Sequence, residues 1–144
     1  MKRYLIFAAI GPFIGGLLLL FATTYASGYW AETNLREVGK FFSTFAWTLQ
    51  YSYLFGIVPS LMLGAIDDIL FHLPRIHYVL RILIVGVIGF GAAELLYGSR
   101  GPDQGALQFL LYGLVGFVPS ILSSWIAHRY VDEPAPVHPK AATN

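Results

Sequence analysis

The chain contains no cysteine and little charge. Without cysteine it cannot form disulfides, cysteine-ligated zinc sites, iron–sulfur clusters or a catalytic thiolate. Charged residues make up 12% of its 144 residues, against about 25% in a typical soluble domain. The net charge is only +1, whereas a nucleic-acid partner requires a basic patch, so we expect no nucleic acid. The length allows one domain, and 56% of its residues are hydrophobic.

Four long apolar segments account for most of the chain. A hydrocarbon core of about 30 Å is crossed by roughly 20 apolar helical residues, and each segment has that length or nearly so. The sequence therefore predicts an all-α membrane bundle of four transmembrane helices over residues 1–130, followed by a disordered tail at 131–144. The expected spans are residues 4–25, 41–66, 78–97 and 106–127.

The distribution of Lys and Arg predicts the orientation in the membrane. With four spans both termini lie on one side, and that side would hold six basic residues against three on the other. Because cytoplasmic segments are enriched in Lys and Arg, we expect both termini and the tail to be cytoplasmic. The six residues are Lys2, Arg3, Arg75, Arg81, Arg129 and Lys140, and the three are Arg36, Lys40 and Arg100.

The second and fourth spans share a sequence repeat. The segment Gly56-Ile57-Val58-Pro59-Ser60-Leu61 matches Gly116-Phe117-Val118-Pro119-Ser120-Ile121 at a spacing of 60 residues. Both spans would run from outside to inside, so the repeat predicts two tandem helical hairpins related by an axis along the membrane normal. For the first and third spans we pair Tyr4 with Tyr78 and Gly15 with Gly89.

Each copy of the repeat places a proline inside a helix. Pro59 and Pro119 cannot donate a backbone hydrogen bond, which leaves the carbonyls near Phe55 and Val115 without their helical partners. In lipid these carbonyls must be satisfied by a neighbouring helix, a side chain or water. Two interpretations stay open, namely packed kinks in a static bundle, or paired hinges with a binding site near the midplane. The second would use Gly56, Pro59, Ser60, Gly116, Pro119 and Ser120.

Small residues line the first and third spans. Gly11 and Gly15 form a Gly-x-x-x-Gly motif, and Gly86 and Gly89 form a similar stripe. Such residues let helix backbones approach closely in a membrane. We therefore expect these four glycines to serve helix packing.

Glu94 is the only acid within a predicted span. An ionisable residue inside the membrane is a candidate functional site. However, Glu94 lies within one turn of Tyr97 and Gly98, close to the outer interface, where it would reach water or pair with Arg100. It is interpreted either as an interfacial anchor or as a proton or cation site.

Charged residues gather at the inner ends of the second and third spans. They are expected to form a salt-bridged hairpin corner composed of Asp67, Asp68, Arg75 and Arg81. A metal site that combines the two acids with His72 and His77 is the alternative, but no metal-binding spacing supports it. On the opposite side, Asn34 and Glu37 resemble a helix-capping box.

The chain resembles a family of small bacterial multi-pass inner-membrane proteins of unknown function. The resemblance rests on the opening Met1–Gly16 segment, on Tyr51-Ser52-Tyr53-Leu54-Phe55-Gly56 and on Asp67-Asp68. It covers most of the chain and implies a bacterial inner-membrane location without implying an activity. Four spans in a short chain are also similar to small lipid-linked-sugar flippases and drug exporters, but the acid that exporters carry in the first span is absent here.

Two functional hypotheses follow from these patterns. The first is a non-enzymatic accessory or assembly subunit that acts through helix contacts with other membrane proteins or with itself, in a lipid bilayer and without a cofactor. The alternative is a small oligomeric transporter or channel that uses the Gly-x-x-Pro-Ser helices and Glu94. An enzyme is not expected, because no nucleophile–base pair or metal-ligand set is visible.

Overall fold

The chain was analysed as a computed structural model, which describes residues 1–32, 34–74, 76–98 and 105–131. These residues form helices and no strand, and four helices are long and apolar enough to cross a membrane. The predicted all-α bundle is confirmed to that extent. The tail after residue 131, Arg75, Arg100 and the connection at 99–104 lie outside the described residues. The elements are α1 (Lys2–Ala26), η1 (Tyr29–Glu32), α2 (Leu35–Phe71), α3 (Tyr78–Ala93), η2 (Glu94–Gly98) and α4 (Ala106–Tyr130).

Helix α2 starts at the predicted cap. The Asn34 side chain accepts a hydrogen bond of 3.1 Å from the backbone N–H of Glu37, which confirms Asn34 as the N-cap. The Glu37 side chain, the other half of the predicted capping box, bonds Tyr29 and Lys40. The helix then continues without interruption through Gly39. At 1.5 Å per residue its 37 residues extend about 55 Å, well beyond a hydrocarbon core of about 30 Å.

The connection between α1 and α2 is tied to the first turns of α2. The Tyr29 hydroxyl donates to Oε2 of Glu37 at 2.6 Å, and Lys40 pairs with Oε1 of the same side chain at 2.8 Å. This hydrogen bond to a carboxylate raises the pKa of Tyr29 above its ordinary value. On the α1 side, Trp30 donates to the Thr24 hydroxyl at 2.9 Å.

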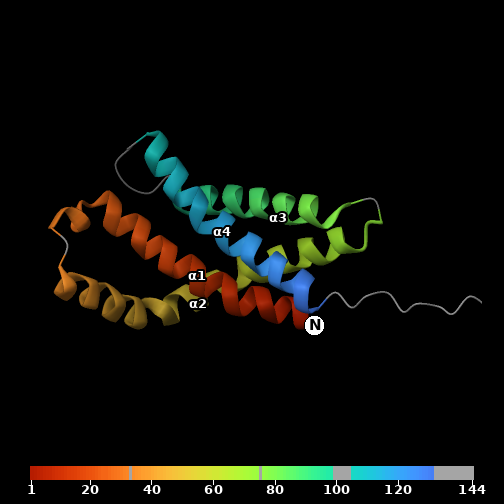
Figure 1. Ribbon diagram of the computed structural model, residues 1–144, viewed down its shortest axis with the longest axis horizontal. Helices are drawn as coiled ribbons and strands as arrows, with labels where there is room; N and C mark the ends of the chain where they lie inside the picture. Colours follow the sequence, from red (N-terminus) through yellow and green to blue (C-terminus); the bar gives the residue numbers. More distant parts are fainter. Residues whose placement is uncertain (33, 75, 99–104, 132–144) are drawn as a thin grey trace, which may run out of the picture.

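The helices pack in the spatial order α2, α1, α4, α3 (Figure 1). Helix α1 contacts both α2 and α4, α4 also contacts α3, and α2 meets α3 and α4 less extensively. The N-terminus, the end of α4 and the α2–α3 connection gather at one end, called the inner end after the predicted orientation (Figure 1). At the opposite, outer end the α1–η1–α2 hairpin and the start of α4 lie apart.

The inner half of the bundle is closed by a small apolar core. Phe7 of α1, Val85 of α3 and Ala127 of α4 are almost fully buried and pack together. Partly buried apolar side chains of α1 and α2 surround them. The helix backbones therefore lie close together at the inner end and separate toward the outer end (Figure 1).

Candidate functional site

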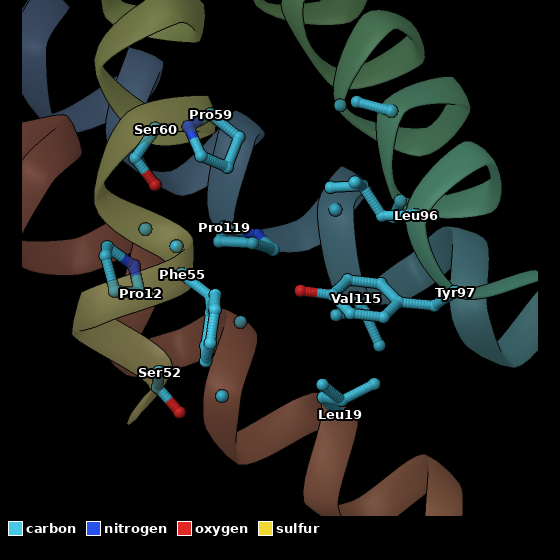
Figure 2. Close-up of a pocket in the computed structure, with 18 of the residues that line it drawn as sticks. Pro12, Leu19, Ser52, Phe55, Pro59, Ser60, Leu96, Tyr97, Val115 and Pro119 are labelled. Atoms are coloured by element: carbon cyan, nitrogen blue, oxygen red, sulfur yellow. The ribbon is translucent and has the colours of Figure 1, made fainter. Parts of the chain in front are cut away.

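A cavity of about 550 Å³ lies between the four helices and η2. Along α1 its lining runs from Phe7 to Thr23, a distance of about 24 Å at the helical rise of 1.5 Å per residue. Figure 2 shows Phe55 and Pro59 of α2 on one side of it, and Leu96 and Tyr97 of η2 on the other. Its volume falls within the roughly 300–1,000 Å³ of small-molecule sites.

Both copies of the sequence repeat contribute to this cavity. All six residues singled out in the repeat line it, namely Gly56, Pro59, Ser60, Gly116, Pro119 and Ser120. A third proline, Pro12 of α1, lines it as well and packs against Gly56. The sequence reading did not use Pro12, although a proline in the middle of the first apolar segment was a visible signal. The cavity therefore lies where three helices carry an internal proline.

The prolines leave carbonyl groups beside the cavity. Pro59 and Pro119 remove the N–H partners of the Phe55 and Val115 carbonyls, and these two residues also line the cavity. The Val115 oxygen faces Gly15 of α1, 3.6 Å from where a Cβ on that glycine would lie. Close approach of the α1 backbone therefore shields this carbonyl from lipid.

The lining is uncharged but rich in hydroxyl groups. Among the described residues, no Asp, Glu, Lys or Arg contributes to it. Five hydroxyl side chains lie toward the outer end and three toward the inner end, with apolar side chains between them. The outer five are Thr23, Thr48, Tyr51, Ser52 and Tyr97, and the inner three are Ser60, Ser120 and Ser123.

Ser123 differs from the other hydroxyl residues of the lining. It is fully buried, and within the described part of the chain its Oγ has no hydrogen-bond partner. By contrast, the hydroxyl of Ser120, one turn earlier on α4, donates to the Gly116 carbonyl at 2.6 Å. A buried hydroxyl without a partner is unusual, because desolvation costs free energy that only a hydrogen bond offsets.

A buried charge cluster lies next to the cavity, on its inner side, and closes the inner end of the bundle. Asp67 of α2 is fully buried and pairs with Arg3 of α1, whose Nη1 lies 3.0 Å from Oδ2. Nε of Arg81, from α3, lies 3.3 Å from Oδ1. Ser124 of α4 donates a hydrogen bond to the same oxygen. One carboxylate therefore joins all four helices.

Further contacts complete this cluster. The Phe71 ring lies under both guanidinium groups, with centroid distances of 4.4 Å to Arg3 and 5.2 Å to Arg81, a favourable cation–π arrangement. Asp68, at the margin, lies 3.7 Å from Nε of Arg3 and accepts a long hydrogen bond from Tyr4.

Of the four residues predicted for the inner corner, the structure brings Asp67, Asp68 and Arg81 together, while Arg75 is outside the described residues. Sequence reasoning missed Arg3 and Ser124. Arg3 was interpreted only as part of the positive N-terminal flank.

The glycine contacts reveal a second repeat, between α1 and α3. A methyl group on Gly11 would overlap Ser60, and one on Gly89 would overlap Ser120, so the two glycines occupy equivalent places. This register, 78 residues apart, aligns Arg3-x-Leu5-Ile6-x-x-x-Ile10-Gly11 with Arg81-x-Leu83-Ile84-x-x-x-Ile88-Gly89. The expected register paired Gly15 with Gly89. The structure instead makes Gly11 the equivalent of Gly89, because these two glycines face equivalent serines.

The repeat explains the composition of the charge cluster. Arg3 and Arg81 occupy equivalent positions, whereas the position equivalent to Asp67, 60 residues later, is Ala127. Both Asp67 and Ala127 are fully buried. Two arginines therefore meet at one buried aspartate, and the second carboxylate of the cluster, Asp68, lies at its partly exposed margin.

The four glycines expected on packing faces all contact the chain's own helices. Gly11 and Gly89 face serines, as described above, and Gly86 faces Ile121 and Phe117. Gly15 is less tightly enclosed, since a Cβ there would meet only ordinary contacts. These faces are covered within the chain and do not form an open surface.

Glu94 lies outside the cavity. It begins η2 and is half-buried, and the backbone of Gly113 in α4 hydrogen-bonds its carboxylate. The predicted partner Arg100 lies outside the described residues. Glu94 thus connects the outer ends of α3 and α4 and does not face the repeat residues.

The two histidines near the inner corner hydrogen-bond backbone groups at the ends of α2 and α3. The His72 ring lies 2.8 Å from the Asp68 carbonyl at the end of α2, and the His77 ring accepts from the backbone N–H of Val79 at the start of α3. In the described ranges no three His, Asp or Glu side chains are grouped as metal ligands.

The cavity and the charge cluster lie in the part of the chain that matches one protein family. The model of DUF5413, a family of unknown function, matches residues 1–133. The chain belongs to this family. The match confirms the expected membership of a family without an assigned function, and it covers every residue of the cavity and the charge cluster. No curated protein and no solved structure matches the chain.

Proposed function

We propose that this protein is a non-enzymatic membrane protein that binds a lipid-like molecule in the cavity between its helices and thereby serves as a small transporter or carrier. The observation that carries the proposal is the cavity itself, whose lining among the described residues is uncharged and includes both Gly-x-x-Pro-Ser segments. Sites at the interface of internal repeats near the membrane midplane are typical of transporters. An uncharged lining favours an apolar molecule over an ion or a charged solute.

The asymmetry of the bundle supports entry from the bilayer or from the outer side. The apolar core around Phe7 and the cluster around Asp67 block the inner end, while the outer ends of the helices diverge (Figure 1). The prolines at Pro12, Pro59 and Pro119 would act as hinges, because a proline interrupts the helical hydrogen bonds around it. In this proposal Glu94 is a connector between α3 and α4 and not a coupling site.

The proposed setting is a bacterial inner membrane, with both termini in the cytoplasm and the chain built as two tandem hairpins. The Lys and Arg distribution supports the orientation. Equivalent contacts of Gly11 with Ser60 and of Gly89 with Ser120 support the tandem hairpins.

An accessory or assembly subunit is the second candidate. The glycine faces are used inside the bundle, but one side of α2 carries large exposed apolar residues such as Trp47, Leu54 and Met62. A partner helix would pack there. Affinity purification in mild detergent distinguishes the two, because an accessory subunit is recovered with a stoichiometric membrane partner and a carrier is not.

A bulky side chain that fills the cavity should strongly reduce binding of the lipid-like molecule. Ala92 lines the cavity from α3, whereas Val87 on the same helix is largely exposed outside it. We expect Ala92→Phe to reduce photolabelling by a diazirine-bearing hydrocarbon chain at cavity peptides at least about tenfold, the change that about 1.4 kcal/mol produces. Val87→Phe adds the same ring outside the cavity and should leave labelling unchanged. Undiminished labelling in a folded Ala92→Phe protein would refute the cavity as the binding site.

The absence of cysteine makes the orientation directly testable. Ser27→Cys lies after α1 and Leu73→Cys lies after α2, and both positions are exposed. In intact cells, a membrane-impermeant maleimide should label Ser27→Cys, and it should label Leu73→Cys only after the membrane is opened. The reverse pattern would place the termini outside.

A further inference from the structure

We infer that the molecule bound in the cavity is a neutral long-chain lipid whose hydroxyl group is held at the inner end by Ser123 and Ser120. This inference rests on the proposed function, because it specifies the chemistry of the ligand in the same cavity. It begins from a single unsatisfied atom, Oγ of Ser123.

The Ser123 hydroxyl requires a partner from outside the chain. The residue is fully buried and lines the cavity, and no described group hydrogen-bonds its Oγ. Buried hydroxyls in folded proteins nearly always have a partner, supplied by protein, water or ligand. Ser123 lies in the wall of the cavity but is covered in this structure, so the partner would be a group in the cavity that reaches Oγ when the Ser123 side chain turns toward it.

The surroundings of Ser123 suit a hydroxyl group on that partner. Ser120 lies three residues earlier, on the same face of α4. Its proton is already donated to the Gly116 carbonyl, so its oxygen is left as an acceptor. Ser123 can donate. A hydroxyl group accepts one hydrogen bond and donates another, and so matches both serines.

Charge complementarity excludes an ionised head group at this end. Among the described residues no charged side chain lines the cavity, and Asp67 of the adjoining cluster is engaged by Arg3, Arg81 and Ser124. An ionised head group would lose its hydration there without gaining a counter-charge. A neutral head group does not meet this cost.

The shape of the cavity indicates a chain behind the hydroxyl group. Outward from Ser123, the lining passes the apolar side chains of Pro119, Val115, Leu20 and Leu19. The lining extends over about 24 Å along α1, and its apolar part between the inner and the outer hydroxyl groups suits a hydrocarbon chain. A long-chain alcohol or a monoacylglycerol combines both features.

Two photoreactive probes test this assignment on the full-length protein in detergent. One is a monoacylglycerol with a diazirine in its acyl chain, and the other is the matching hydrocarbon without the glycerol. We expect Ser123→Ala to lower labelling of cavity peptides by the monoacylglycerol about three- to tenfold, the range that one lost hydrogen bond produces. Labelling by the hydrocarbon should stay constant. Ser43→Ala, at an exposed position of α2, is the matched control and should change neither.

The outcomes separate this inference from the proposed function. If Ala92→Phe blocks both probes but Ser123→Ala changes neither, the hydroxyl anchor is wrong while the cavity remains a binding site. Equal loss of both probes in Ser123→Ala would indicate a packing defect and would also overturn the anchor. If Ala92→Phe blocks neither probe, the proposed function itself fails.

Discussion

Replacement of Asp67 by Asn should destabilise the protein by about 3–5 kcal/mol, the cost of removing one partner from a buried ion pair. Asn keeps the shape of the side chain but removes the negative charge that lies between two buried guanidinium groups. Arg3 and Arg81 approach opposite oxygens of this carboxylate. Without it, two like charges face each other in a medium of low polarity, and the contact that joins all four helices is weakened.

Reversible unfolding in mixed SDS–detergent micelles, followed by tryptophan fluorescence, measures this loss. Asp68→Asn is the matched control, because the Asp68 side chain is 36% exposed and lies at the margin of the cluster. It should cost less than about 1 kcal/mol, as for an exposed ion pair. A similar cost for the two variants would mean that Asp67 is not the centre of the cluster.

An apolar triple variant tests whether charge or packing is responsible. Arg3→Met, Asp67→Leu and Arg81→Met together replace the three buried charges by apolar side chains and leave only the partly exposed carboxylate of Asp68. Buried ion pairs replaced by well-packed apolar residues often lose no stability. We therefore expect the triple variant to recover most of the stability lost in Asp67→Asn. A triple variant less stable than Asp67→Asn would contradict an electrostatic origin of the effect.

The second large effect is expected at the contact between α3 and α4. A Cβ added to Gly116 would overlap the carbonyl group of Gly89 and crowd Ala93. Backbone atoms cannot move aside as a flexible side chain can, so the two helices must separate. We expect Gly116→Ala to destabilise the protein by about 1–3 kcal/mol or more, the range for overpacked interiors.

Gly91 of α3 provides a control, because alanine there should raise the stability rather than lower it. A Cβ at Gly91 would meet nothing within 4 Å, and the residue lies inside α3. Gly91→Ala should therefore stabilise the helix by about 0.5–1 kcal/mol, because alanine loses less backbone entropy than glycine. The same unfolding assay measures both variants. If Gly116→Ala were neutral or stabilising, the close helix contact would not exist.

Several features could be predicted from the sequence because they depend on local pattern. The apolar segments predicted four helices, since length and hydropathy alone determine whether a helix can cross a bilayer. Asn34 and Glu37 predicted the start of α2, because a cap involves residues three positions apart. The Gly-x-x-Pro-Ser repeat singled out six residues that all line one cavity.

Other features were not predicted, because they depend on which helices are neighbours. Arg3 was a flank residue by sequence, and only the packing of α1 against α2 brings it to Asp67 across 64 residues. The second repeat, between α1 and α3, is visible in the sequence, but its register is defined only by the contacts of Gly11 and Gly89 with equivalent serines. For Glu94 the sequence suggested a functional site together with the repeat residues, but in the structure Glu94 does not line the cavity that those residues form.

By itself, the sequence determined that this chain is a bundle of long apolar helices, that it cannot use thiol chemistry, and that its prolines and glycines recur in a repeat. Only the tertiary structure decided that Ser123 is a buried hydroxyl beside a cavity and that two arginines share one aspartate. The physical reason is that helix formation depends on residues within a few positions of one another, whereas a cavity or a buried ion pair depends on side chains that meet across different helices.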